Sequence, residues 1–213
     1  LVERHPHAVI EGLALAGIVT GATKGYLYLI EDMAGPLASV EMALKEADDA
    51  GLLPFAIEIH CGPTTYVAGE ETAALNSIEG QPAKPRKKPP FPGESGLFGK
   101  PTTINNTETL AHVAWIARNS GSEFAAIGTE ESKGTLLFTL SSQVEKPGVY
   151  ELPFGATYRQ LIEGCGGGLK DGRTVRAILP AMSASFLSAD HLDVPIAYET
   201  LRPLGSSPGC GGV

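Results

Sequence analysis

Two strand-like runs flank one helix-like run within residues 24–60, KGYLYLIEDMAGPLASVEMALKEADDAGLLPFAIEIH. Side chains suited to β-structure alternate over 24–30 and again over 55–60, which is the period of a strand. Between them, Gly35-Pro36 opens a run with apolar residues at helical spacing, and Gly51 stands where a helix C-terminal cap belongs. The order strand, helix, strand indicates a βαβ unit, so the sequence predicts an α/β fold around a parallel sheet.

Composition excludes several classes of protein. Of the 213 residues, 43% are hydrophobic and 19% are charged, which is typical of a globular chain and not of a disordered one. The net charge of −8 argues against nucleic acid binding through a general positive surface. No apolar run approaches the roughly 20 residues of a membrane helix, so we expect no membrane insertion. Cys61, Cys165 and Cys210 form no C-x-x-C pair and the histidines are dispersed, so we predict a reducing cytoplasm and no metal site.

Both ends suggest a longer polypeptide. The chain begins with Leu1, carries no signal-peptide pattern, and enters a predicted helix at 7–20 almost at once. Residues 205–213 have the pattern of a turn that leads into a strand with no residues left. We therefore expect an internal piece of a larger protein.

The middle of the chain changes in character. Residues 80–103 are rich in proline and glycine, so we expect no regular structure there, and a loop of this length is typical of a functional or disordered segment. Asn105 and Glu108 have the spacing of a helix capping box, which predicts that Asn105 begins the next helix. Residues 118–133 are polar and separate the two halves.

The second half has the pattern of a small α+β module. Thr157 and Gln160 form a predicted capping box at the start of a short helix. Strands are expected at 134–140, 149–152 and 175–179, with the helix at 157–163.

The run Gly62-Pro-Thr-Thr-Tyr-Val-Ala-Gly-Glu-Glu-Thr72 lies between a predicted strand and a predicted helix at 70–78. Such a turn at the carboxyl edge of a parallel sheet is where α/β folds bind ligands. Gly69 permits close backbone approach, and we expect free N–H groups at the helix start to meet a phosphate or carbonyl oxygen. Glu70 and Glu71 either accept hydrogen bonds from a ligand or merely stabilise the positive end of the helix.

A second group of candidates follows in the loop. Four positive charges fall within Lys84-Pro-Arg-Lys-Lys88, which either attracts a phosphate-bearing molecule or is simply a solvated loop. Phe91, set between prolines, either presents a flat face to a base or pins the loop to the core. Asn105 and Asn106 stand at a second helix start, where one of them is explained by capping alone.

Several long motifs, in order along the chain, resemble one protein family. They are Tyr66-Val-Ala-Gly-Glu-Glu-Thr72, Ser77-Ile-Glu-Gly80, Pro85-Arg-Lys-Lys-Pro-Pro-Phe-Pro92 and Gly96-Leu-Phe-Gly-Lys-Pro-Thr-Thr-Ile-Asn-Asn-Thr-Glu-Thr109. Together they resemble the flavin-bearing 51-kDa or F subunit of respiratory complex I (NADH-quinone oxidoreductase) and the related diaphorase subunits of hydrogenases and formate dehydrogenases. The second half resembles the β-grasp soluble-ligand-binding (SLBB) domain of that family through Lys146-Pro-Gly-Val-Tyr-Glu-Leu-Pro153 and Gly166-Gly-Gly168.

The resemblance implies a Rossmann-like FMN- and NADH-binding domain at 1–133 without its N-terminal part, a β-grasp domain at 134–204, and the start of a return strand at 205–213. It implies hydride transfer from NADH to FMN and single-electron transfer to an iron–sulfur cluster. No side chain is expected to be catalytic, because hydride transfer is the chemistry of the cofactors themselves. By motif, Glu71 would lie near the nicotinamide amide, Lys88 near the dinucleotide phosphates and Phe91 on the adenine. The residues implied to line FMN are Tyr66, Gly69, Glu70, Asn105, Asn106 and Thr109.

The resemblance also implies partner subunits, and it implies that some cofactor-binding segments of the family lie outside this sequence. A thioredoxin-like 2Fe-2S subunit and a further iron–sulfur subunit are expected, in the cytoplasm or attached peripherally to its membrane through a complex. The glycine-rich FMN loop of the family would lie before Leu1 and the [4Fe-4S] ligands after Val213, so this chain alone is expected to bind FMN weakly or not at all. Whether the reductant is NADH or NADPH, and which complex is served, stays open. The alternative is a non-catalytic module whose β-grasp half docks a partner or a small ligand.

Overall fold

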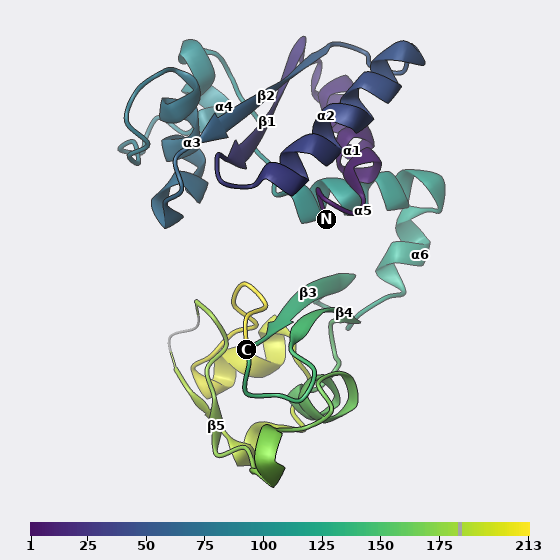
Figure 1. Cartoon of the computed structure of the whole chain (residues 1–213), viewed down its shortest axis with the longest axis vertical. Coiled ribbons are helices and arrows are strands. Elements are labelled where there is room, and N and C mark those ends of the chain that lie inside the picture. The colour runs from purple at the N-terminus through teal and green to yellow at the C-terminus, as the bar shows by residue number, and fades with distance from the viewer. Residues whose placement is uncertain (183–184) are drawn as a thin grey trace. The chain divides into compact units, whose positions relative to one another are not determined.

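The computed structural model describes residues 1–182 and 185–213 and divides into two units, Leu1–Arg118 and Asn119–Val213 (Figure 1). The polar residues 119–133, assigned above to the first domain, make their contacts within the second unit. The domain limits inferred from the sequence stay a prediction.

The first unit contains the expected βαβ arrangement. Strands β1 (Lys24–Ile30) and β2 (Ala56–Gly62) pair in parallel, and helix α2 (Ala34–Asp49) connects them. The helix stops because Gly51 adopts a φ of 66°, a left-handed conformation that glycine takes without strain. This turn lets Leu52 N donate to Ala47 O at 2.9 Å, which satisfies a carbonyl at the helix end. The α/β class is therefore confirmed.

Close packing of two helices completes the core of this unit. Helix α1 (Pro6–Thr20) lies against α5 (Thr107–Arg118), and a Cβ atom on Gly12 would fall 1.9 Å from Leu110 O. Only glycine permits that approach, since real Cβ atoms essentially never lie so near a backbone oxygen. The buried apolar side chains around the contact are Val9, Ile10, Leu27, Leu29, Val40, Ala43 and Leu110.

Two local expectations for the first unit are wrong. The loop 80–103 contains a helical turn, α4 (Pro92–Ser95), in which Glu94 accepts a hydrogen bond from Phe91 N at 3.2 Å, and a 3-10 turn at Leu97–Gly99. Pro92 favours the turn because its fixed φ suits the first helical position. Asn105 also does not cap α5: Asn106 Oδ1 accepts from Glu108 N at 2.8 Å, one residue later than expected.

The second unit is a small α+β fold. Strands β3 (Thr135–Leu140) and β4 (Gly148–Pro153) form an antiparallel hairpin, and the final residues pair with β3 through Val213 N and Thr139 O at 2.9 Å. The Thr157–Gln160 capping box is confirmed, since each side chain bonds the backbone N–H of the other at 3.1 and 2.9 Å. It precedes a π-helix, Gln160–Cys165. The strand expected at 175–179 is shorter, with β5 (Ala177–Ile178) pairing β6 (Leu187–Ser188).

The remaining elements of the second unit are short. They are α6 (Gly121–Ala125), α7 (Tyr198–Leu201) and 3-10 turns at Lys170–Gly172, Ala189–His191 and Arg202–Leu204. Among the residues that the structure describes, no helix has both the length and the apolar character needed to cross a bilayer.

The core of the second unit contains a polar atom without a partner. Tyr158 is fully buried, and its hydroxyl has no hydrogen-bond partner among the described residues. Burial raises the pKa of this hydroxyl, because the ionised form is poorly solvated there. An unsatisfied buried hydroxyl costs about 1–3 kcal/mol.

We predict that Tyr158→Phe leaves the free energy of unfolding unchanged or raises it by about 1 kcal/mol, since only the unsatisfied oxygen is removed. The matched change Tyr150→Phe should lower it by about 1 kcal/mol, because the Tyr150 hydroxyl donates to Lys146 O at 2.7 Å. Urea denaturation measures both. A clear loss of stability in Tyr158→Phe would contradict the prediction.

Candidate functional site

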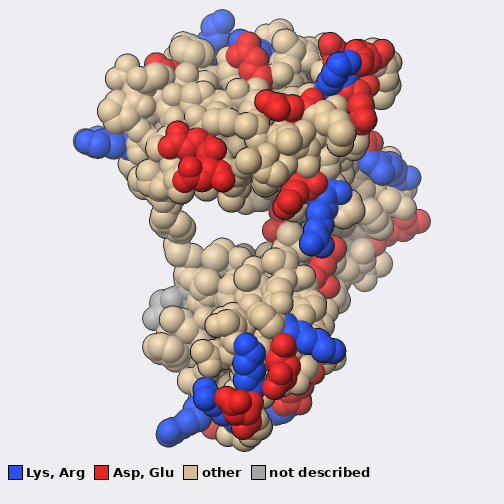
Figure 2. All heavy atoms as spheres, in the orientation of Figure 1, with Lys and Arg blue, Asp and Glu red and all other residues tan. Residues whose placement is uncertain are grey.

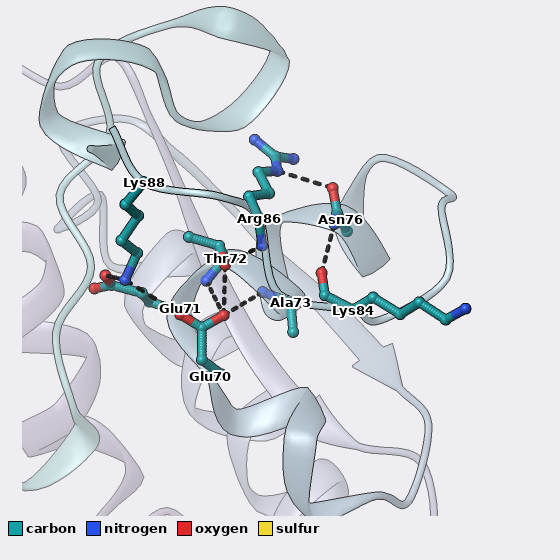
Figure 3. Close-up of polar contacts among 8 residues, drawn as sticks. All are labelled: Glu70, Glu71, Thr72, Ala73, Asn76, Lys84, Arg86 and Lys88. Carbon is teal, nitrogen blue, oxygen red and sulfur yellow. Dashed lines mark hydrogen bonds and ion pairs between the residues drawn. The ribbon is translucent and has the colours of Figure 1, made fainter. Parts of the chain in front are cut away.

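The turn between β2 and α3 (Glu71–Ile78) is fixed by one carboxylate, that of Glu70 (Figure 3). Its Oε2 atom accepts hydrogen bonds from Thr72 N and Ala73 N, both at 2.9 Å, and from Thr72 Oγ1 at 2.5 Å. Glu70 is therefore the N-cap of α3. The expectation of free N–H groups at this helix start is wrong for Thr72 and Ala73, because Glu70 already accepts from both.

The other oxygen of Glu70 meets the loop. Lys88 Nζ donates to Glu70 Oε1 at 3.2 Å and also to Glu71 Oε1, so one ammonium group joins both carboxylates. The three side chains are between 29% and 40% exposed, so water still reaches them and screens the pair. The two acidic residues thus do more than stabilise the end of a helix: they hold a lysine from a distant segment.

The contacts shift pKa values in the direction that favours charge. Burial acts to raise the pKa of Glu70, but the hydrogen bonds from Thr72 and Ala73 together with the interaction with Lys88 hold that pKa below its ordinary value. The hydrogen bond to Glu71 raises the pKa of Lys88, with burial opposing it and Glu70 adding to the rise. Both groups are ionised at neutral pH.

Only part of the basic cluster Lys84–Lys88 is a solvated loop. Arg86 and Lys88 are half-buried and contact α3 or its cap, whereas Lys84 and Lys87 are exposed. Lys84 contributes its backbone oxygen to Asn76 Nδ2 at 2.6 Å, while its side chain points away from the cluster (Figure 3). On the face drawn in Figure 2, wide uncharged areas separate the charged patches. The interpretation as a solvated loop therefore holds for Lys84 and Lys87, and binding of a phosphate-bearing molecule by the cluster stays a prediction.

A cavity of about 180 Å³ opens beside the turn. Glu71 and Asn105 both line it, together with residues of β1, α1 and α3. Two of the residues singled out from the sequence, 34 positions apart, therefore line the same cavity. Cavities that hold whole drug-sized ligands measure about 300–1,000 Å³, so this one accommodates only part of such a molecule.

The other predicted residues lie around this turn and loop or on α5. Tyr66 begins a 3-10 turn, Tyr66–Gly69, with 82% of its surface exposed, and a Cβ on Gly69 would meet nothing within 4 Å. Phe91 is 56% exposed, so it does not pin the loop to the core. Asn106 caps α5, and Thr109 is an exposed residue of that helix that does not line the cavity.

Sequence reasoning gave no individual role to the residues that hold the site together. Thr72, buried to 2% exposure, accepts from Arg86 N at 2.7 Å while donating to Glu70. The Arg86 side chain contacts Asn76, Glu79 and Gly96. The signals for Arg86 were its membership of the basic cluster and of the motif Pro85–Pro92. Among the described residues, no three histidine, cysteine, aspartate or glutamate side chains gather in a way that could hold a metal ion.

We predict that this unit loses stability in acid through Glu70 and Glu79. Burial opposes ionisation of Glu79, but Arg86 and Phe98 N hold its pKa below the ordinary value, as the cap does for Glu70. Their contribution is fully present above the ordinary glutamate pKa of 4.5 and is lost as the pH falls through the lower folded values.

Measured by urea denaturation at several pH values, the double variant Glu70→Gln/Glu79→Gln should show a shallower loss of stability below pH 4.5 than the unchanged chain. The variant Glu41→Gln, at an exposed position of α2, serves as the control and should keep the original slope. Equal slopes in all three proteins would contradict the prediction.

Comparisons with known proteins identify the family and the fold of the chain. Residues 1–115 match the family described as the Nuo51 FMN-binding domain, and residues 138–181 match the SLBB domain. The chain is 41% identical to the F 2 subunit of the NADH-quinone oxidoreductase of Rhizobium meliloti, over 100% of this chain and 53% of that protein. It is 37% identical to the HndC subunit of the NADP-reducing hydrogenase of Solidesulfovibrio fructosivorans, over 100% of this chain and 46% of that protein.

Solved structures agree as well. A chain in the crystal structure of an NAD+-reducing [NiFe]-hydrogenase in the air-oxidized state superposes with a TM-score of 0.87 at 34% identity, over 99% of this chain and 36% of that one. The chain spans about half the length of the curated relatives that it matches. Because the Nuo51 match alone covers more than half of its residues, this chain belongs to the Nuo51 FMN-binding family, with an SLBB domain in its second half.

Proposed function

We propose that this chain forms the flavin- and NADH-binding part of an NADH:acceptor oxidoreductase subunit. The observation that supports the proposal most directly is the position of Glu71. Its side chain lines the cavity that Asn105 also lines, and its carboxylate pairs with Lys88 from the loop. Residues implied to meet the flavin and the dinucleotide are therefore adjacent, as hydride transfer between two stacked rings requires.

The residues present fit FMN in part. The open space beside Gly69 leaves room for a ring system against the backbone, and Asn105 offers an amide to its polar edge. The cavity volume of about 180 Å³ covers only a portion of a flavin, so the rest of the cofactor would lie over the rim. We propose that the residues holding FMN are Tyr66, Gly69, Glu70, Asn105, Asn106 and Thr109.

The residues of this chain would bind the flavin and the dinucleotide and orient them relative to one another. A bound FMN would accept two electrons as a hydride and release them singly. Glu71 offers a carboxylate oxygen to the carboxamide of the nicotinamide, and Lys88 offers its ammonium to the dinucleotide phosphates. Phe91, exposed on the loop, offers a face for the adenine to stack on. No acid or base is needed from the protein.

The expected partner subunits and location of the protein follow from the same proposal. The curated relatives are named as subunits of NADH-quinone oxidoreductases and of a hydrogenase, which supports assembly with other electron-transfer chains. We propose a thioredoxin-like 2Fe-2S subunit and a further iron–sulfur subunit as partners, in the cytoplasm or peripheral at its membrane. The relatives are about twice as long as this chain, so we assign the [4Fe-4S] ligands to sequence outside residues 1–213.

The first test uses the polypeptide encoded by the whole reading frame that contains this chain. We expect flavin absorbance in the purified protein and ferricyanide reduction by NADH. Glu71→Ala should reduce turnover per bound flavin at least about tenfold, because the nicotinamide loses its carboxylate acceptor and its orientation.

The matched control is Glu46→Ala, which removes an exposed glutamate paired with His7 in the same unit and should leave turnover unchanged. Full activity in Glu71→Ala would exclude the assigned role of that residue. Absence of both flavin and NADH oxidation in the unchanged protein would instead favour a non-catalytic binding module.

A second prediction concerns Phe91. Stacking of a base on an aromatic side chain contributes about 1–3 kcal/mol, so Phe91→Ala should raise the KM for NADH about tenfold with little change in kcat. Phe186→Ala, which removes a phenyl ring that is 68% exposed in the second unit, is the control. An unchanged KM in Phe91→Ala would contradict the stacking role.

A further inference from the structure

One arginine of the loop has a role that ligand contacts do not explain. The Arg86 side chain is 26% exposed, and its contacts in the described part of the chain are to the protein itself (Figure 3). Nε donates to Asn76 Oδ1 at 2.8 Å, Nη1 donates to Gly96 O at 3.0 Å, and Nη2 lies 2.8 Å from Glu79 Oε2. A surface arginine placed only for solubility would not order three partners around its guanidinium.

These partners come from separate segments. Asn76 belongs to α3 and Glu79 follows its last turn, whereas Gly96 lies at the far end of the loop. Glu79 extends the connection, because its Oε1 accepts from Phe98 N at 2.7 Å. One guanidinium therefore ties the start of the loop, its end and the helix into a single arrangement.

The backbone of the same residue reaches the cap of α3. Arg86 N donates to the Thr72 hydroxyl, and that hydroxyl donates to Glu70. Exposure alternates along the segment, with Arg86 and Lys88 half-buried and Lys87 exposed between them. The side chains of Arg86 and Lys88 thus both contact the protein, Arg86 at Asn76 of α3 and Lys88 at Glu70 and Glu71 (Figure 3).

We propose that Arg86 is a positioning residue: it sets the distance between the segment that carries Lys88 and Phe91 and the turn that carries Glu70 and Glu71. The inference rests on the proposed function and deepens it. Arg86 touches neither ligand in this assignment and acts through the residues beside it. Its side chain supports the dinucleotide half of the site, while the backbone N–H groups that hold Glu70 do not depend on it.

The contacts of residue 86 suit arginine better than another cation. The guanidinium presents donors in a planar fork, of which Nε and Nη1 point to an amide oxygen and a backbone oxygen, while Nη2 lies at ion-pair distance from a carboxylate. A lysine at this position would keep the ion pair with Glu79 and lose the fixed separation of the other two contacts. The substitution Arg86→Lys is therefore expected to preserve the alignment of the site only in part.

The test measures kcat, KM for NADH and bound flavin in the polypeptide from the whole reading frame. Arg86→Met should raise the KM at least about tenfold while kcat and flavin content stay within about twofold, because the dinucleotide contacts lose their alignment and the flavin contacts do not. Arg86→Lys should give a KM between those of the unchanged protein and Arg86→Met. Arg118→Met, which removes an exposed arginine paired with Glu11 on the same unit, should leave KM unchanged.

An unchanged KM in Arg86→Met overturns the proposal, and so does a loss of flavin and kcat with KM constant. If Arg86→Met does not fold, Arg86→Lys and Glu79→Gln decide the question: a raised KM in both supports positioning, and an unchanged KM in both overturns it. Failure of the proposed function is distinguishable, because the unchanged protein would then neither hold flavin nor oxidise NADH.

Discussion

The candidate site depends on the carboxylate of Glu70, whose two oxygens accept hydrogen bonds from different segments of the chain. One oxygen satisfies two amide groups and a hydroxyl at the start of α3, and the other meets Lys88 from the loop. A helix N-cap contributes about 0.5–2 kcal/mol. The cap also orders its surroundings, because the Glu70 carboxylate orients the side chain of Thr72 and attracts Lys88. Glu70 thereby adds a contact between the turn after β2 and the loop to those that Thr72 and Glu71 make.

This arrangement constrains how an anionic ligand can bind. Helix N-termini commonly meet phosphates with free N–H groups, but here Glu70 has taken those of Thr72 and Ala73. The negative charge of Glu70 also disfavours an anion at that point, whereas it suits hydroxyl and amide donors. Under the proposed function, phosphate recognition would fall to cations such as Lys88, which is already held beside two carboxylates. The negative charge of the turn therefore favours those parts of a ligand that carry hydrogen-bond donors.

The fold could be predicted where the pattern is local. Alternation marked β1 and β2, helical spacing marked α2, and Gly51 marked its end, because each signal lies within a few neighbouring residues. The cap of α5 was misplaced by one residue, since Asn105 and Asn106 can both cap and only the backbone geometry selects between them. Arg86 was not singled out, because its partners Asn76 and Gly96 have no sequence signature and are brought to it by the folded loop.

The size of the cavity explains why the loop matters. A space of about 180 Å³ beside Glu71 and Asn105 is smaller than a flavin and a dinucleotide, so under the proposed function most of the ligand surface would lie outside it. Tyr66, on the turn, and Phe91, on the loop, are exposed aromatic rings that offer flat contact area with few rotatable bonds. In that assignment, affinity would depend on the spacing between the turn and the loop as well as on the shape of the cavity. The contacts that fix this spacing would therefore affect affinity alongside the residues that touch the ligand.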